Sequence, residues 1–142
     1  MGVDVVPRVL IAEGDAVLRQ QLFSALLGFD VFSDMVGTTG DALTRLAQER
    51  YGVIVIDVGL HSGDVDRVIG HIAAMPVAQR PVVLVLASNP ETTRSLDVEI
   101  VQIVLRKPVN LPQLVDVVRS CVRSSQKRPI ANPAERGDAM QS

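Results

Sequence analysis

Short, continuous apolar runs alternate along this chain with segments of helical period, and this alternation constrains the fold more than any other feature. Runs of this length, rich in β-branched residues, are typical of strands buried on both faces, as in parallel sheets. Alternating strands and helices then predict a doubly wound α/β sheet with helices on both faces. The three clearest runs are Val9–Ala12, Val53–Ile56 and Val82–Leu86, and two weaker ones are Val31–Val36 and Val101–Leu105.

Apolar residues at helical spacing lie between these runs. They form stripes at Leu18, Leu22, Ala25 and Leu26, at Leu43, Leu46 and Ala47, and at Val65, Val68, Ile69 and Ile72. The last helix is the clearest, because Asn110 and Gln113 resemble a capping box ahead of a stripe that runs from Leu111 to Val122. A helix is also expected within Asn89–Glu99, although that segment has poor periodicity.

The length and the apolar content fit one domain. The chain has 142 residues, 47% of them apolar, which is enough for one well-buried core. We expect an N-terminal lead at residues 1–7, the domain at 8–123 and a disordered tail at 124–142. The tail is polar and contains prolines, so it cannot bury enough surface to offset the entropy of ordering.

Charge and cysteine content exclude several classes of protein. Fourteen basic and sixteen acidic side chains give a net charge of −2, so no basic field indicates a nucleic-acid partner. No apolar run approaches the roughly 20 residues that span a bilayer, and the N-terminus lacks the features of a secretory signal. Cys121 is the single cysteine, so no internal disulfide can form. These features predict a cytoplasmic protein without membrane insertion.

Polar residues follow the predicted strands where each strand ends. Glu13 and Asp15 follow the first strand, Asp57 the third, Ser88 the fourth and Lys107 the fifth. Carboxyl ends of parallel strands meet at one edge of a sheet, so we expect Asp57, Glu13 and Lys107 to converge, with Asp57 open to solvent. Converging carboxylates favour a cation, and oxygen ligands of this kind suit Mg²⁺. A nearby lysine would neutralise a transferring phosphoryl group, with a carboxylate as its acceptor.

This arrangement resembles the receiver domain of two-component response regulators, over roughly residues 8–123. The resemblance implies a flavodoxin-like (βα)5 fold with a parallel sheet in the order 2-1-3-4-5. Four stretches carry it in the right order: Val9–Asp15, Val53–Asp64, Pro81–Ala87 and Val104–Pro108.

The same resemblance implies roles for individual residues. Asp57 would be the phospho-acceptor, and Lys107 would contact the phosphoryl group. Glu13 takes the place of the first metal-binding acid, Asp57 would also contact the Mg²⁺, and Gly59 would offer its backbone carbonyl to that ion. The Lys107–Pro108 bond would be cis.

Three positions depart from the family pattern. Gly14 stands where the family has an aspartate that binds the metal, so we expect weakened Mg²⁺ binding. Asp15 is a less suitable ligand, because it is placed to cap the first helix. Leu86 replaces a hydroxyl residue, for which Ser88 is a possible substitute, and Val104 replaces an aromatic switch residue.

The function implied is that of an atypical receiver domain. A histidine kinase or phosphotransfer protein would phosphorylate Asp57, and the domain would signal to an effector protein without turning over a separate substrate. One alternative is a pseudo-receiver, a protein-binding module that is never phosphorylated. A second alternative, a flavodoxin-like small-molecule binder or enzyme that uses the same crevice, is disfavoured because the acidic loop Glu13–Asp15 would repel a phosphate. The sequence leaves homodimerisation open.

Four other features have ordinary structural interpretations. Gly37–Asp41 predicts a turn and a helix cap rather than a phosphate loop. His61 is expected in a loop and His71 on the surface of its helix. Cys121 is expected to act as a small buried hydrophobe.

Overall fold

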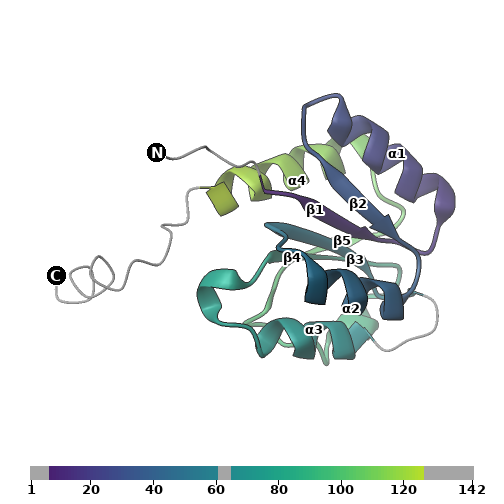
Figure 1. Cartoon of the computed structure of the whole chain (residues 1–142). Helices are drawn as coiled ribbons and strands as arrows, with labels where there is room; N and C mark the ends of the chain where they lie inside the picture. The colour runs from purple at the N-terminus through teal and green to yellow at the C-terminus, as the bar shows by residue number, and fades with distance from the viewer. Residues whose placement is uncertain (1–6, 61–64, 127–142) are drawn as a thin grey trace, which may run out of the picture.

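Five parallel strands form the centre of the molecule (Figure 1). The computed structural model describes residues 7–60 and 65–126. The strands pair in the order β2-β1-β3-β4-β5, which confirms the predicted sheet. Their bounds are β1 Val9–Ala12, β2 Ser33–Val36, β3 Val53–Asp57, β4 Val82–Ala87 and β5 Val101–Arg106.

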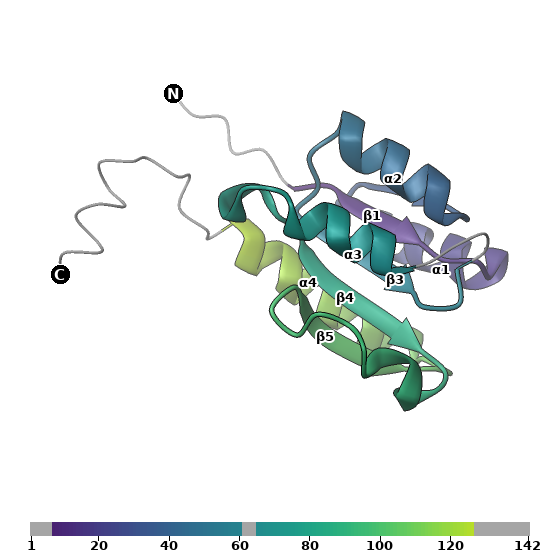
Figure 2. The same ribbon diagram turned by 90° about the horizontal axis from the view of Figure 1, so that it is seen from below.

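Helices cover both faces of the sheet, as Figure 1 and Figure 2 show from two directions. Helices α2 and α3 pack on one face, and α1 and α4 pack on the other. None of these helices is both long and apolar enough to cross a bilayer. Their bounds are α1 Ala16–Leu27, α2 Thr39–Gln48, α3 Val65–Ala73 and α4 Leu111–Gln126.

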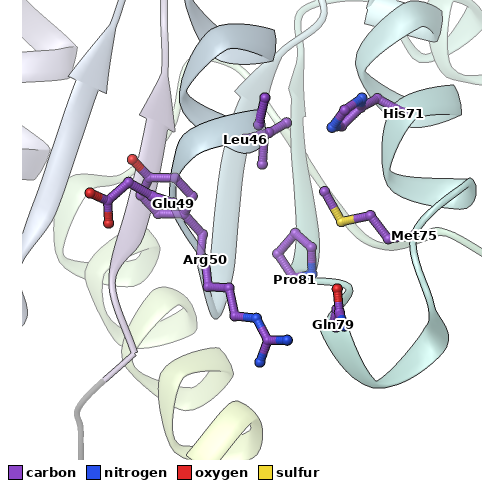
Figure 3. Close-up of a pocket in the computed structure, with 9 residues that line it drawn as sticks. Leu46, Glu49, Arg50, His71, Met75, Gln79 and Pro81 are labelled. Atoms are coloured by element: carbon purple, nitrogen blue, oxygen red, sulfur yellow. The ribbon is translucent and has the colours of Figure 1, made fainter.

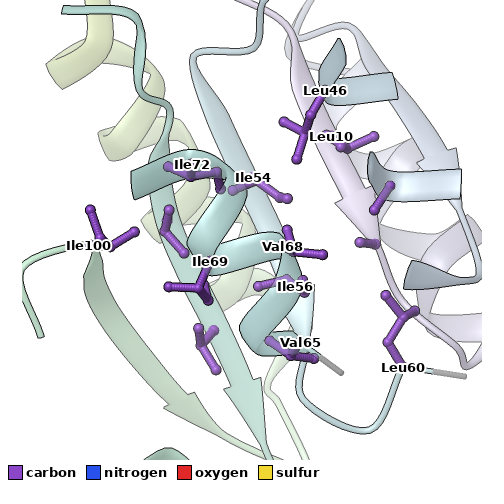
Figure 4. Close-up of a cluster of buried hydrophobic side chains, with 14 of the residues drawn as sticks. Leu10, Leu46, Ile54, Ile56, Leu60, Val65, Val68, Ile69, Ile72 and Ile100 are labelled. Atoms are coloured by element: carbon purple, nitrogen blue, oxygen red, sulfur yellow. The ribbon is translucent and has the colours of Figure 1, made fainter. Parts of the chain in front are cut away.

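Two apolar cores hold these layers together. Strands β1, β3 and β4 are buried along their whole length, because their side chains alternate between the two covered faces. In the core under α2 and α3, Ile54 and Ile56 lie against Val68 and Ile72 (Figure 4). The buried central strands therefore fix the points from which the loops after them start.

The connection between β4 and β5 differs from our expectation of a helix within Asn89–Glu99. It contains a 3₁₀ helix, Pro90–Thr93, followed by turns, so four α-helices are present within the described ranges instead of the five of a complete (βα)5 fold. Leu96 and Ile100 are its buried apolar residues, too few for the stripe that docks a helix. The outer face of β5 is consequently left partly open, with Val104 48% exposed.

Helix α4 begins as predicted but ends later. Asn110 Oδ1 accepts a hydrogen bond of 3.0 Å from the Gln113 N–H, which caps the helix. The helix continues to Gln126, so the expected disorder from residue 124 is wrong for residues 124–126. The rest of that expected tail, 127–142, and most of the N-terminal lead, 1–6, lie outside the described residues.

Candidate functional site

Three charged side chains from distant parts of the chain meet at the carboxyl edge of the sheet. Asp57 is the last residue of β3, Glu13 follows β1 and Lys107 follows β5. Lys107 Nζ lies 3.0 Å from Asp57 Oδ2 and 2.9 Å from Glu13 Oε1. The topology causes this, since parallel strands bring their carboxyl ends to one edge. The predicted convergence is confirmed, and the role of each group stays a prediction.

Backbone hydrogen bonds continue the sheet past the strand ends and fix two of these residues. The Glu13 N–H donates to the Val36 carbonyl at 3.1 Å, and the Lys107 N–H donates to the Ala87 carbonyl at 2.9 Å. The Lys107–Pro108 peptide bond is cis, as the resemblance implied. Both charged side chains thus start from backbone that the sheet holds in place.

The three groups are buried to different degrees. The side chain of Glu13 is 1% exposed, that of Asp57 11% and that of Lys107 18%. We expected Asp57 to be open to solvent, and its side chain reaches solvent only over this small exposed fraction. Burial of charged groups is unfavourable unless they are paired, and Lys107 pairs with both acids here.

The surroundings shift the pKa of all three groups. Burial alone would raise the pKa of Asp57, but the neighbouring Glu13 and the hydrogen bonds from the Gly59 N–H and Lys107 outweigh it and lower that pKa. Burial raises the pKa of Glu13, and the neighbouring Asp57 carboxylate raises it further. Burial opposes the charge of Lys107, yet the two acids raise its pKa above the ordinary value. Asp57 is therefore the acid that is more readily ionised, and Lys107 stays charged at neutral pH.

One carboxylate oxygen is left without a hydrogen bond. Asp57 Oδ1 accepts from the Gly59 N–H at 2.9 Å, and Glu13 Oε2 accepts from the Asp15 N–H at 3.0 Å. Glu13 Oε1 is buried near Lys107 Nζ, but no described residue donates a well-directed hydrogen bond to it. A buried acceptor without a donor is unfavourable, so this oxygen retains the capacity to bind a cation.

The carboxylate oxygens of Glu13 and Asp57 are the ones here that could hold a Mg²⁺ ion. Mg²⁺ binds one or two carboxylates and keeps several waters, and Glu13 and Asp57 meet that minimum. Gly14 adds no side-chain oxygen. Asp15 Oδ1 caps α1 by accepting two backbone N–H groups at 2.9 and 3.3 Å, which confirms its predicted cap. Among residues 7–60 and 65–126, no group of three or more His, Cys, Asp or Glu side chains is placed to hold a metal.

Leu86 and Ser88, which the sequence comparison with receiver domains singled out, lie differently relative to Asp57. Leu86 is 1% exposed and pairs directly with Asp57 between β3 and β4. Ser88 lies beyond β4, is exposed, and forms no hydrogen bond with the charged groups in the described part of the chain. His61, together with the end of the acceptor stretch at 62–64, lies outside the described residues.

Arg19 supports the site and was missed by the sequence analysis. Its Nη1 donates a hydrogen bond of 2.8 Å to the backbone carbonyl of Glu13, which ties α1 to the end of β1. The guanidinium lies close to Gly37, where an added Cβ would be 2.7 Å from Nη1. The sequence does place an arginine one turn into the first helix. Only the fold shows that a glycine, Gly37, lies beside it and leaves room for the guanidinium.

We therefore expect Gly37→Ala to lower the free energy of unfolding more in the wild type than in an Arg19→Ala variant. The difference should be about 1 kcal/mol, the typical contribution of one hydrogen bond. The new methyl group would push the guanidinium away from the Glu13 carbonyl. Chemical denaturation of the two single variants and the double variant measures this coupling free energy. Gly40→Ala is the control, because nothing lies within 4 Å of its added Cβ. Fully additive effects would contradict the assigned contact.

Solved structures share this fold at low sequence identity. No protein-family model and no curated protein matches the chain. A CheY-like response regulator receiver domain protein from Methanospirillum hungatei JF-1 superposes with a TM-score of 0.76 at 14% identity, covering 87% of this chain and 98% of that one. The receiver domain of the sensor histidine kinase PA1611 from Pseudomonas aeruginosa PAO1, with magnesium in its active site cleft, gives 0.71 at 18% identity, covering 83% and 98%.

A third solved structure has a different description. It represents a family of redox sensors in the streptococci that evolved from two-component response regulators. It gives a TM-score of 0.71 at 20% identity and covers 83% of this chain and 52% of that one. The chain has the fold of the CheY-like response regulator receiver domains.

Proposed function

We propose that this chain is an atypical receiver domain that accepts a phosphoryl group on Asp57. The observation that supports it most directly is the distance of 3.0 Å between Lys107 Nζ and Asp57 Oδ2 at the carboxyl edge of the sheet. The donor in this proposal is a phosphohistidine of a histidine kinase or phosphotransfer protein. Work beside such a kinase would place the chain in the cytoplasm.

The proposed chemistry is a transfer onto the carboxylate. An oxygen of ionised Asp57 attacks phosphorus, the bond between phosphorus and the donor nitrogen breaks, and the nitrogen keeps the electron pair of that bond. The lowered pKa of Asp57 favours the ionised nucleophile. Lys107 then pairs with the phosphoryl oxygens, whose added charge is larger than that of the free carboxylate. The product is an acyl phosphate, and no separate substrate is turned over.

A bound Mg²⁺ would be held weakly in this proposal. Glu13, Asp57 and the Gly59 carbonyl are the candidate ligands, and Asp15 is a less suitable one because its Oδ1 caps α1. The ion supplies charge neutralisation for the phosphoryl oxygens. The magnesium in the active site cleft of the Pseudomonas aeruginosa receiver domain is consistent with this placement.

Phosphorylation of such a domain would not be relayed through the hydroxyl and aromatic side chains that receiver domains use. Leu86 has no hydroxyl to hold a phosphoryl oxygen, and Val104 is not aromatic and is already 48% exposed. We propose that the output is a changed contact with an effector protein, since a modification shifts an equilibrium only through differential contacts. No DNA-binding role is proposed for the domain itself.

Two observations favour a second candidate, a pseudo-receiver that binds a protein partner without phosphorylation. Lys107 already pairs with both acids, and the Asp57 side chain is only 11% exposed. The neighbouring family of streptococcal redox sensors, described as evolved from response regulators, shows that this fold serves other signals in those proteins.

Incubation with acetyl phosphate and Mg²⁺ separates the two candidates. We expect the wild type to gain about 80 Da, the mass of one phosphoryl group, as measured by mass spectrometry. Asp57→Asn should gain nothing, because the amide is not a nucleophile. Asp15→Asn is the matched control and should still be labelled, because its carboxylate caps α1 outside the ion pairs. A wild type that stays unlabelled where an ordinary receiver is labelled would establish the pseudo-receiver.

A further inference from the structure

We propose that a second cleft, between α2 and α3, binds a small organic carboxylate with an apolar body. The cleft has a volume of about 250 Å³. Its walls come from the end of α2, from α3 and from the connection between α3 and β4 (Figure 3). This proposal does not depend on phosphorylation of Asp57.

The cleft lies at the opposite edge of the sheet from the charged site. Tyr51 and Pro81, which line it, precede β3 and β4 at their amino ends. Asp57 lies at the other end of β3, on the order of 15 Å away for a strand of that length. A ligand here would not compete with a group bound at Asp57.

The walls of the cleft are fixed before any ligand arrives. The Tyr51 hydroxyl donates a hydrogen bond of 2.7 Å to Asp34 Oδ2, and Tyr51 as a whole is 5% exposed. On the other side, the Arg80 guanidinium donates to the carbonyls of Ala73 at 2.8 Å and Met75 at 3.1 Å. These bonds hold the chain that connects α3 to β4. Preorganised walls reduce the entropy that a ligand must offset on binding.

The charge of the cleft favours an anion at one end. Arg50 extends toward Gln79 and Pro81, whereas the Glu49 carboxylate is turned away from His71 and Met75 (Figure 3). No ion pair or hydrogen bond joins the Arg50 guanidinium to another residue in the described ranges. A guanidinium binds a carboxylate through two parallel hydrogen bonds, and the Gln79 amide adds a donor nearby.

The rest of the lining favours an apolar body over a bare ion. Met75 and Pro81 lie in the middle of the cleft, and Leu46 and the half-buried His71 lie at the far end from the Arg50 guanidinium (Figure 3). An inorganic anion would leave these apolar walls uncovered. The volume lies just below the range of about 300–1,000 Å³ that holds drug-sized ligands, so the ligand should be small.

The test is a titration followed by amide NMR spectra of the full chain. The probes are benzoate, its uncharged isostere benzamide, and N-acetylphenylalanine as a mimic of the terminal carboxylate of a peptide. We expect a carboxylate to bind with a Kd on the order of millimolar, with shifts at the end of α2 and between α3 and β4. Benzamide should bind about tenfold more weakly, because it lacks the charge that pairs with Arg50.

Variants connect the signal to the proposed contacts. Arg50→Ala should weaken benzoate binding about tenfold, while Arg67→Ala, at an exposed position on α3 outside the lining, should leave it unchanged. Tighter binding of N-acetylphenylalanine than of benzoate would identify a peptide terminus as the source, and the reverse a free carboxylate. The absence of shifts at millimolar concentrations of either carboxylate, or equal binding by Arg50→Ala, would overturn the proposal.

Discussion

Lys107→Met is expected to destabilise the folded protein by about 3 kcal/mol at pH 8, the low end of the cost of breaking a buried ion pair. The lysine pairs with two carboxylates, and Glu13 is 1% exposed. Methionine is similar in length and flexible, so the change removes mainly the charge. Chemical denaturation measures the loss as a lower midpoint at an unchanged slope.

The loss should shrink as the pH falls. Without the ammonium, Glu13 and Asp57 face each other unneutralised, and the pKa of each rises relative to the wild type. At pH values between the ordinary carboxyl pKa and these raised pKa values, the folded variant binds more protons than its unfolded chain. The stability of the variant therefore falls as the pH rises through this interval. In the wild type the lysine contribution disappears only above its own raised pKa, in the alkaline range. The destabilisation by Lys107→Met is therefore smaller at pH 5 than at pH 8.

Two controls separate charge from packing. Arg106→Met changes the exposed neighbour and should alter stability by less than about 0.5 kcal/mol. Adding Asp57→Asn to Lys107→Met should recover part of the loss at pH 8, because one of the two facing charges is gone. An equal loss at pH 5 and pH 8, with no recovery in the double variant, would show that Lys107 acts through packing alone.

Much of the fold could be predicted because its signals are local. The runs Val53–Ile56 and Val82–Leu86 are β-branched and continuous, which is typical of strands covered on both faces, and each strand matches to within one residue. The helix expected within Asn89–Glu99 is wrong for a related reason. Its apolar residues lack a helical period, and the expectation came from the alternation of elements alone.

The residues of the site that the strand topology brings together could be predicted from the sequence. The contacts that depend on side-chain conformation could not. Parallel strands bring Glu13, Asp57 and Lys107 together whatever their exact conformations. The contact between Arg19 and the Glu13 carbonyl depends on the space above Gly37, which lies in another loop. His71 was expected on the surface of its helix, and it is half-buried there in the wall of the cleft between α2 and α3. Contacts of this kind join segments that are distant in the sequence, so a periodic pattern of apolar residues does not predict them.

Gly14→Asp is expected to raise the affinity for Mg²⁺ at the proposed metal site at least tenfold. The substitution returns the carboxylate that the family carries there. No described glycine has a positive φ, so the backbone at this position accepts an aspartate. Isothermal titration calorimetry, with amide spectra to locate the ion, measures the change.

The stability of the same variant provides a second measurement. Without metal, a third carboxylate beside Glu13 and Asp57 adds like-charge repulsion, so Gly14→Asp should be less stable than the wild type. Added Mg²⁺ should reverse that loss, because an ion that binds only the folded state stabilises it by mass action. Gly70→Asp is the matched control, since it adds the same charge on α3, where nothing lies within 4 Å of the new Cβ. Equal responses of the two variants to Mg²⁺ would show that position 14 does not face the proposed metal site. The missing aspartate would then not explain weak binding of Mg²⁺.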